Sequence, residues 1–432
     1  MQLNKLVTRI RCSDIGRRMV TGAFWSFTGT ATAKLIVLVA SIVCARILTK
    51  AEYGEFGIIR STINMFVAVG AAGMGLTAAK YISEYRTKDK EHCGSIYLLT
   101  NGFALAMGFL ICICLVVFSP MLASTTLNAP YLINDLRLGA VLLFVSILNG
   151  AQNGTLAGFE NFRSIAFNTL YGSIAEAVFM LLGGWLWGVS GAVLGFGCGF
   201  AVLFICNHIS IRKLLRQKQI PWHYSSFRKS DLLLLYKFSL PAALSSLVTA
   251  PTLWVVRSIL VRQNGFEELA IFEAADQWKI IILFIPGAIS QVVLPILSNI
   301  TSTNDEHKFW KILKLNLYLN GGITSILALG ISILSPWIMG LYGQDFTNYR
   351  TLIFLAASTV FTALASVVGL SIYSRAKMWV SLVFNLCWSI MTIGFSYGFV
   401  KHGLGASGIA LAFLCSYVIH TSIQLIYLKC SK

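Results

Sequence analysis

Apolar segments long enough to cross a membrane recur along the whole chain and restrict its fold to that of a membrane protein. A membrane-spanning helix needs about 20 apolar residues. The sequence holds about a dozen such stretches, and only 12% of its 432 residues are charged, against about 25% in a soluble domain. We therefore predict an all-α, polytopic membrane protein. The predicted spans are 20–44, 56–79, 95–118, 136–157, 164–187, 189–210, 238–260, 269–293, 312–334, 351–373, 379–399 and 404–428.

Basic residues alternate between the predicted loops. They occur before the first span and after the second, fourth, sixth, eighth, tenth and last spans, and they are sparse in the intervening loops. Positive charge collects on the cytoplasmic side of membrane proteins. The pattern therefore places both termini in the cytoplasm and supports an even number of spans. It also accounts for the net charge of +17 without a nucleic-acid partner.

The sequence divides near its midpoint. A basic linker at 211–237 separates an N-lobe of six spans (20–210) from a C-lobe of six (238–428). Short segments at 1–19 and 429–432 form the predicted cytoplasmic N-terminus and tail. Six spans per half give both halves the same orientation, which is a parallel repeat about an axis along the membrane normal.

The two halves also carry a weak internal repeat in sequence. KAEYGEFGIIRSTIN (50–64) aligns with QNGFEELAIFEAADQ (263–277) without a gap, which places Arg60 opposite Glu273. In transporters built from repeats, the substrate site lies at the interface between them. The predicted architecture is two pseudo-symmetric six-helix lobes around a central cleft.

Ionisable residues inside the predicted spans are confined to a few places. A charge held in hydrocarbon costs at least about 2.5–3.5 kcal/mol, so such residues usually face a partner or a water-filled path. Two corresponding helix pairs carry six of them, and this concentration indicates a polar cavity between two halves of a transporter. The six are Lys34 and Arg60 in the first two spans, and Arg257, Glu273, Asp276 and Lys279 in the seventh and eighth.

Loops and motifs argue against an enzyme. The longest outward-facing loops, 119–137 and 335–350, are too short to form a catalytic domain. The chain has no G-x-x-x-x-G-K-[ST] motif for nucleotide phosphates. It also has no Cys/His cluster of metal-ligand spacing, and we expect neither a metal nor another cofactor.

Several stretches are similar to a known family. The first helix hairpin reads ARILTKAEYGEFGI (45–58) and then GAAGMGLTAAKYISEYR (70–86), and the eighth span reads FEELAIFEAADQWKIIILFIPGAISQVVLPILS (266–298). These stretches resemble bacterial polysaccharide flippases of the Wzx type, within the multidrug/oligosaccharidyl-lipid/polysaccharide exporter superfamily. The resemblance covers the chain end to end.

The resemblance implies a MATE-like fold whose two lobes open alternately to the cytoplasm and the periplasm. The implied cargo is an oligosaccharide linked to undecaprenyl pyrophosphate, such as an O-antigen repeat unit, and the implied location is the bacterial inner membrane. Implied partners are membrane lipids, a polysaccharide polymerase and a chain-length regulator.

Four basic residues are candidates for binding this cargo: Lys34, Arg60, Arg257 and Lys279. Lys34 lies near the middle of the first span, too deep for easy snorkelling to the interface. We predict that it anchors the pyrophosphate or acidic sugars. The alternative is a structural pair with an acid such as Glu176 in the fifth span.

Acidic residues in the eighth span, together with Glu176 in the fifth, are candidates for a gate or for coupling. Glu273 and Asp276 are three residues apart on one helical face, which Lys279 continues. Beside the arginines they predict a salt-bridge network that closes the outer half of the cleft. A permanent structural bridge is the alternative, and a titrating or cation-holding group is a third reading.

Two local features complete the set. Pro251 and Pro286 each remove a helical hydrogen bond, so they are predicted hinges beside the cleft, with kinking for packing as the alternative. In the turn GFENFR (158–163), Glu160 and Arg163 are expected to pair with each other.

The predicted function is therefore a glycolipid flippase, and two other classes fit the sequence less well. A cation-coupled multidrug exporter of the same fold would favour an uncompensated acid in the first or seventh span, where this chain has Lys34 and Arg257. A membrane polymerase or ligase would normally have a large outer loop with Arg and His, and the outer loops here are small.

Overall fold

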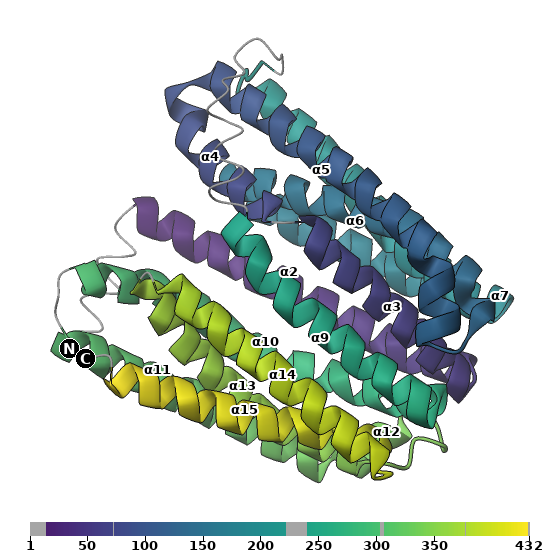
Figure 1. The fold of residues 1–432 in the computed structure, drawn as a ribbon. Coiled ribbons are helices and arrows are strands. Elements are labelled where there is room, and N and C mark those ends of the chain that lie inside the picture. The colour runs from purple at the N-terminus through teal and green to yellow at the C-terminus, as the bar shows by residue number, and fades with distance from the viewer. Residues whose placement is uncertain (1–13, 72, 222–239, 303–305, 376, 431–432) are drawn as a thin grey trace. The chain divides into compact units, whose positions relative to one another are not determined.

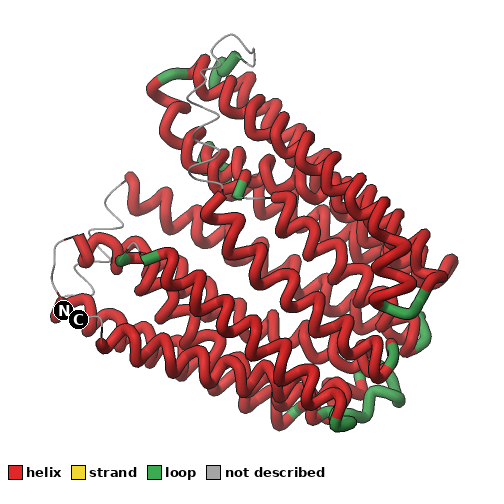
Figure 2. Tube along the Cα trace, in the orientation of Figure 1, coloured by secondary structure: helices red, strands yellow, loops and turns green. Residues whose placement is uncertain are grey.

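A computed structural model describes residues 14–71, 73–221, 240–302, 306–375 and 377–430. Over these residues the chain forms helices joined by short loops, and it has no strand (Figure 1, Figure 2). Backbone groups in hydrocarbon have to satisfy their hydrogen bonds within the segment, which is why long apolar stretches become helices. The predicted all-α class is confirmed.

The helices follow the predicted spans. The first half holds α2 (Asp14–Ile47), α3 (Lys50–Ala71), α4 (Met74–Lys88), α5 (Lys90–Pro120), η1 (Met121–Thr126), η2 (Pro130–Leu132), α6 (Ile133–Gly158) and α7 (Phe162–Gln217). The second half holds α9 (Leu240–Asn264), α10 (Phe266–Ser302), α11 (Glu306–Ile333), α12 (Ser335–Gly340), α13 (Arg350–Ser374), α14 (Met378–Lys401) and α15 (Gly405–Cys430).

Eight helices in the described part of the chain are long and apolar enough to span a membrane. They become nine if α3 and α4, bent by 41° at their junction, count as one span. The remaining predicted spans coincide with the second arm of α7, with α9 and with α10.

Helix α7 consists of two arms. Trp187 and Gly188 leave helical geometry, and Gly188 has φ 58° and ψ −136°, a conformation that glycine adopts without a steric penalty. On either side of this break the backbones of Gly183 and Gly191 approach so closely that a Cβ on either would overlap the other. The break falls at the boundary predicted between the spans 164–187 and 189–210.

The chain forms two compact units. Unit 1 comprises described residues within Met1–Ala40, Phe66–Phe118 and Leu136–Ala243. Helices α4 to α7 share one of its hydrophobic clusters, which includes Tyr81, Ile96, Leu156, Phe159 and Ile211.

Unit 2 comprises described residues within Ser41–Met65, Ser119–Asp135 and Leu244–Lys432. In it α13 packs against α10, α11 and α15, and α15 packs against α14. The segment Ser41–Met65 joins this unit through polar contacts, because Arg46 Nε donates to the carbonyl of Leu341 at 2.6 Å.

These units regroup the chain relative to the predicted lobes. Residues 41–65 and 119–135 pack with the second half of the sequence instead of the first. The two six-helix lobes remain a prediction. Most of the predicted N-terminus (1–19) and linker (211–237) lies outside the described residues, and α7 continues to Gln217, into the first part of that linker.

Candidate functional site

The charged residues of the seventh and eighth predicted spans come together because α9 and α10 form a hairpin. The two helices are separated only by Gly265, so residues at similar distances from this turn face one another. Arg257 is eight positions before Gly265, and Glu273 is eight positions after it. The turn therefore brings an arginine and a glutamate together from opposite helices.

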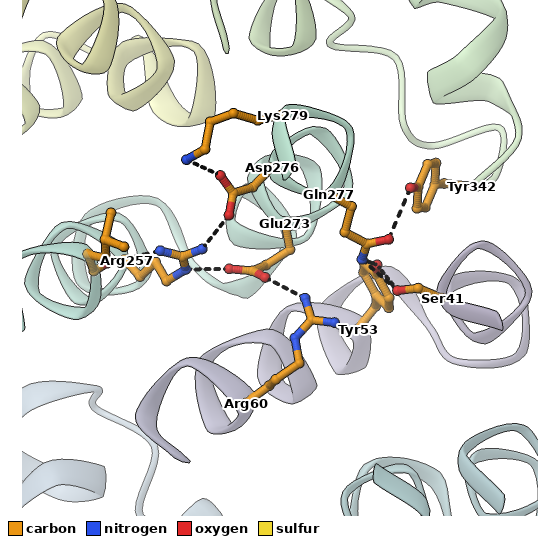
Figure 3. Close-up of polar contacts among 10 residues, drawn as sticks. Ser41, Tyr53, Arg60, Arg257, Glu273, Asp276, Gln277, Lys279 and Tyr342 are labelled. Carbon is orange, nitrogen blue, oxygen red and sulfur yellow. Dashed lines mark hydrogen bonds and ion pairs between the residues drawn. The ribbon is translucent and has the colours of Figure 1, made fainter. Parts of the chain in front are cut away.

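Arg257 binds both carboxylates of α10. Its Nε donates to Glu273 Oε1 at 2.5 Å and its Nη2 donates to Asp276 Oδ2 at 2.8 Å (Figure 3). The third donor, Nη1, reaches the carbonyl of Leu253 at 3.2 Å. The guanidinium fork is thus held in one orientation by charge-assisted hydrogen bonds, which are stronger than neutral ones.

Each carboxylate has a second cation. Arg60 of α3 donates from Nη2 to Glu273 Oε2 at 2.8 Å, and Lys279 Nζ lies 2.5 Å from Asp276 Oδ1 (Figure 3). The result is a continuous network in the order Arg60, Glu273, Arg257, Asp276, Lys279. We call these five residues the charged network.

The charged network is largely buried and carries a net positive charge. The side chains of Glu273 and Arg257 are 3% and 8% exposed, and even Arg60 is only 17% exposed. Three cations meet two carboxylates, so one positive charge has no counterion within the network. A charge in such surroundings interacts strongly with any anion that reaches it, because the local dielectric is low.

Aromatic rings support all three cations. Arg60 lies 5.6 Å from the ring centre of Phe56, Arg257 lies 5.2 Å from that of Phe272, and Lys279 lies 4.7 Å from that of Phe413. Such contacts lower the cost of holding a cation away from water. They stabilise the cations without neutralising them.

The pairing of Arg60 with Glu273 agrees with the sequence repeat. The two residues are 213 positions apart, which is the offset that aligns α3 with α10. Gly57 allows the approach of the two helices, since a Cβ there would lie 2.6 Å from Glu273 Cγ. The repeat is therefore reflected in a direct contact between α3 and α10.

Residues 19–301 match the family described as polysaccharide biosynthesis protein. The chain belongs to this family. It is 25% identical over 397 residues to the EPS I polysaccharide export inner membrane protein EpsE of Ralstonia solanacearum, with 88% of this chain and 87% of the relative covered. It is 23% identical over 410 residues to the lipid III flippase of Escherichia coli K12, with 91% and 95% covered.

Similarity to solved structures shows the fold of this chain. An inward-facing multidrug resistance MATE family transporter of the MOP superfamily matches with a TM-score of 0.82 at 17% identity, covering 92% of this chain and 94% of the transporter. A MOP superfamily transporter from Pyrococcus furiosus matches with a TM-score of 0.73 at 16% identity, covering 96% and 95%. The family resemblance and the MATE-like fold are confirmed.

Sequence reasoning missed a neutral network beside the charged one. Gln277 Nε2 donates to Ser41 Oγ at 2.6 Å and to Tyr53 OH at 2.7 Å (Figure 3). The hydroxyl of Tyr342 reaches Gln277 Oε1 at 3.4 Å, and burial raises the pKa of this phenol, which keeps it a donor. Gln277 follows Asp276 directly, which was an available signal, but nothing in the sequence marked Ser41 or Tyr342.

Two predicted site residues lie in the other unit. Lys34 on α2 and Glu176 on α7 belong to unit 1, and both are partly buried. Across the described residues Lys34 has no ion pair with a carboxylate. Convergence of Lys34 and the charged network on one cleft remains a prediction.

The two predicted hinges lie within continuous helices. Helix α9 continues through Pro251, and α10 continues through Pro286. Each proline removes one backbone donor from its helix, which weakens the helix locally. Bending at these positions remains a prediction.

Proposed function

We propose that this chain is a flippase that moves an undecaprenyl-pyrophosphate-linked oligosaccharide, such as an O-antigen repeat unit, from the cytoplasmic to the periplasmic leaflet. It works by alternating access in the inner membrane, as a transporter and not as an enzyme, with both termini in the cytoplasm. Family membership supports a role in polysaccharide biosynthesis, and the names of the relatives support export and flipping. A polymerase and a chain-length regulator are its proposed partners.

The excess cation of the charged network is the observation that carries this proposal. Pyrophosphate offers the same oxygen chemistry as a carboxylate, and arginine binds both in a bidentate fashion. Cargo phosphates would compete with Glu273 and Asp276 for Arg60, Arg257 and Lys279. The two carboxylates therefore act as the gate, since they hold the cations until the cargo arrives.

Lys34 is the proposed second anchor. A lysine ammonium in the middle of a membrane-spanning helix binds phosphate as a point charge. Lys34 lies on α2 in unit 1. Glu176 stays a candidate for coupling in unit 1.

The membrane potential gives this transport a direction. Moving one negative charge outward across an inside-negative membrane is favourable by about 2.3 kcal/mol per 100 mV. Pyrophosphate carries more than one charge, so the potential favours export wherever that charge is not compensated. A nucleotide site is not required for this step.

Complementation tests the proposed function. A strain lacking this gene should lose surface polysaccharide and accumulate a lipid-linked oligosaccharide on the cytoplasmic side, and the wild-type chain should reverse both effects. Accumulation is read from radiolabelled sugar in the lipid extract. Normal polysaccharide display in the deletion strain, with no lipid-linked intermediate, would contradict the proposal.

A double variant tests whether Arg60 binds the cargo or only forms a salt bridge with Glu273. Arg60→Met/Glu273→Met removes one cation and one carboxylate, so the net charge of the network is unchanged and Arg257 keeps Asp276. Replacing a buried ion pair by apolar residues is often neutral for stability. We expect normal folding by thermal denaturation but at least about tenfold less transport, because a charge-assisted contact of 1.5–3 kcal/mol with the cargo is lost. Wild-type transport by this variant would limit Arg60 to a structural role.

A further inference from the structure

The turn between α6 and α7 differs from the sequence expectation. Glu160 was expected to pair with Arg163, but its carboxylate binds Arg86 of α4 instead. Glu160 has a φ of 58°, so its backbone turns away from a helical path just before α7 begins. In the described part of the chain, no carboxylate forms an ion pair with Arg163.

Arg163 is held by aromatic rings. Its guanidinium carbon lies 5.3 Å from the ring centre of Trp25 on α2 and 5.7 Å from that of Phe167 on α7. Stacking uses the flat face of a guanidinium and leaves its N–H donors at the edge. Arg163 is also exposed. The arrangement therefore presents an oriented cation without neutralising it.

The rings around Arg163 form a continuous aromatic cluster in unit 1. Phe24 and Trp25 have ring centres 5.8 Å apart, Trp25 and Phe167 are 5.4 Å apart, and Phe167 stacks on Tyr171 at 6.4 Å. Phe24 and Tyr171 are 59% and 52% exposed. We call these four rings and Arg163 the aromatic–arginine cluster.

The corresponding turn in the second half of the chain shows that an arginine at this position can be paired with a carboxylate. This turn, between α13 and α14, carries Arg375, which also lies on a ring, 4.4 Å from the centre of Phe309. Arg375 is neutralised, because its Nη2 donates to both carboxylate oxygens of Glu306 at 3.0 Å. Arg375 in one half is thus paired with an acid, and in the described residues Arg163 in the other half is not.

An apolar stripe continues from the cluster along α7. Ile174, Val178 and Leu182 follow Tyr171 at helical spacing and are 42%, 47% and 50% exposed. At 1.5 Å per residue, the stretch from Arg163 to Leu182 covers about 28 Å, close to the thickness of the hydrocarbon core. A lipid with its headgroup at Arg163 would lie with its tail along this stripe.

We propose that the aromatic–arginine cluster is a loading site for the phosphate-linked sugar of a polyprenyl glycolipid. Arg163 binds the phosphate through its N–H edge, and the exposed faces of Phe24 and Tyr171 pack against the C–H face of the first sugar. The combination of cation and rings fits a sugar phosphate better than a phospholipid headgroup, which has no sugar ring to stack. The inference rests on the proposed function and adds a first binding step at the end that the charge pattern places in the cytoplasm.

Binding to the purified full-length chain in detergent tests this site. The probes are undecaprenyl pyrophosphate with one attached sugar, undecaprenyl pyrophosphate alone, and phosphatidylglycerol. We expect Arg163→Gln to weaken binding of both polyprenyl probes about tenfold, the factor expected for one charge-assisted hydrogen bond. Arg375→Gln, the matched control, should change binding less than twofold. Tyr171→Leu should weaken only the probe that carries the sugar.

Three outcomes would overturn the proposal. They are unchanged binding by Arg163→Gln, equal losses for Arg163→Gln and Arg375→Gln, or displacement of the glycolipid by an equal concentration of phosphatidylglycerol. Size-exclusion profiles that match the wild type show that the variants fold. If the wild-type chain itself binds no polyprenyl probe, the proposed function fails too. If it binds and Arg163→Gln binds equally well, only the loading site fails.

Discussion

Glu273→Gln is expected to lower the free energy of unfolding by about 3–5 kcal/mol, the range for removal of one partner from a buried ion pair. Glu273 accepts from Arg60 and Arg257 at once, and its side chain is 3% exposed. The isosteric amide keeps the volume but removes the charge. The charged network then contains three cations and one carboxylate, that of Asp276.

Thermal unfolding of the purified chain, followed by tryptophan fluorescence, measures this loss. Glu267→Gln on the same helix is the matched control, because Glu267 is 67% exposed and lies 3.7 Å from Lys50. An exposed pair of this kind contributes at most about 1 kcal/mol. Equal shifts in the unfolding midpoint for the two variants would show that the charged network does not stabilise the fold.

Arg257→Met should cost less than Glu273→Gln although Arg257 makes more contacts. Without Arg257, Glu273 keeps Arg60 and Asp276 keeps Lys279, so each buried carboxylate retains one cation. The number of uncompensated charges therefore decides which of the two variants loses more stability. A larger loss for Arg257→Met in the same thermal measurement would contradict this charge count.

The charged network was largely predictable because it depends on short-range rules. Helical spacing places Glu273, Asp276 and Lys279 on one face, and a one-residue turn folds α9 back on α10. The internal repeat then aligned Arg60 with Glu273, and the two residues make a direct contact. Each of these relations follows from the spacing of residues along the chain.

Other contacts depend on packing between distant segments, and residue spacing does not predict them. Tyr342 follows the short helix α12, yet it reaches Gln277 on α10. Glu160 has Arg163 three positions away and still binds Arg86, because the backbone at Glu160 is not helical. For the same reason the compact units differ from a simple division at the midpoint, since residues 41–65 and 119–135 join the second half.

Lys34→Ala is expected to abolish surface polysaccharide while the protein still reaches the membrane. Lys34 lies within α2, about ten residues or more from either end of its predicted span, so its position in hydrocarbon is costly unless it has a function or a partner. In the described residues it forms no ion pair with a carboxylate, so its removal leaves no known buried acid unpaired. Loss of one charge-assisted contact with the cargo would slow transport by about 10–100-fold.

Surface polysaccharide, measured at equal protein level in the membrane fraction, distinguishes this loss from misfolding. Lys401→Ala is the matched control, because Lys401 is exposed at the end of α14 and should display polysaccharide normally. Lys34→Arg keeps the charge and should restore part of the display, since a guanidinium also binds phosphate. If Lys34→Ala displays as much polysaccharide as the wild type, the cargo does not depend on this ammonium, and Lys34 is not one of the binding groups.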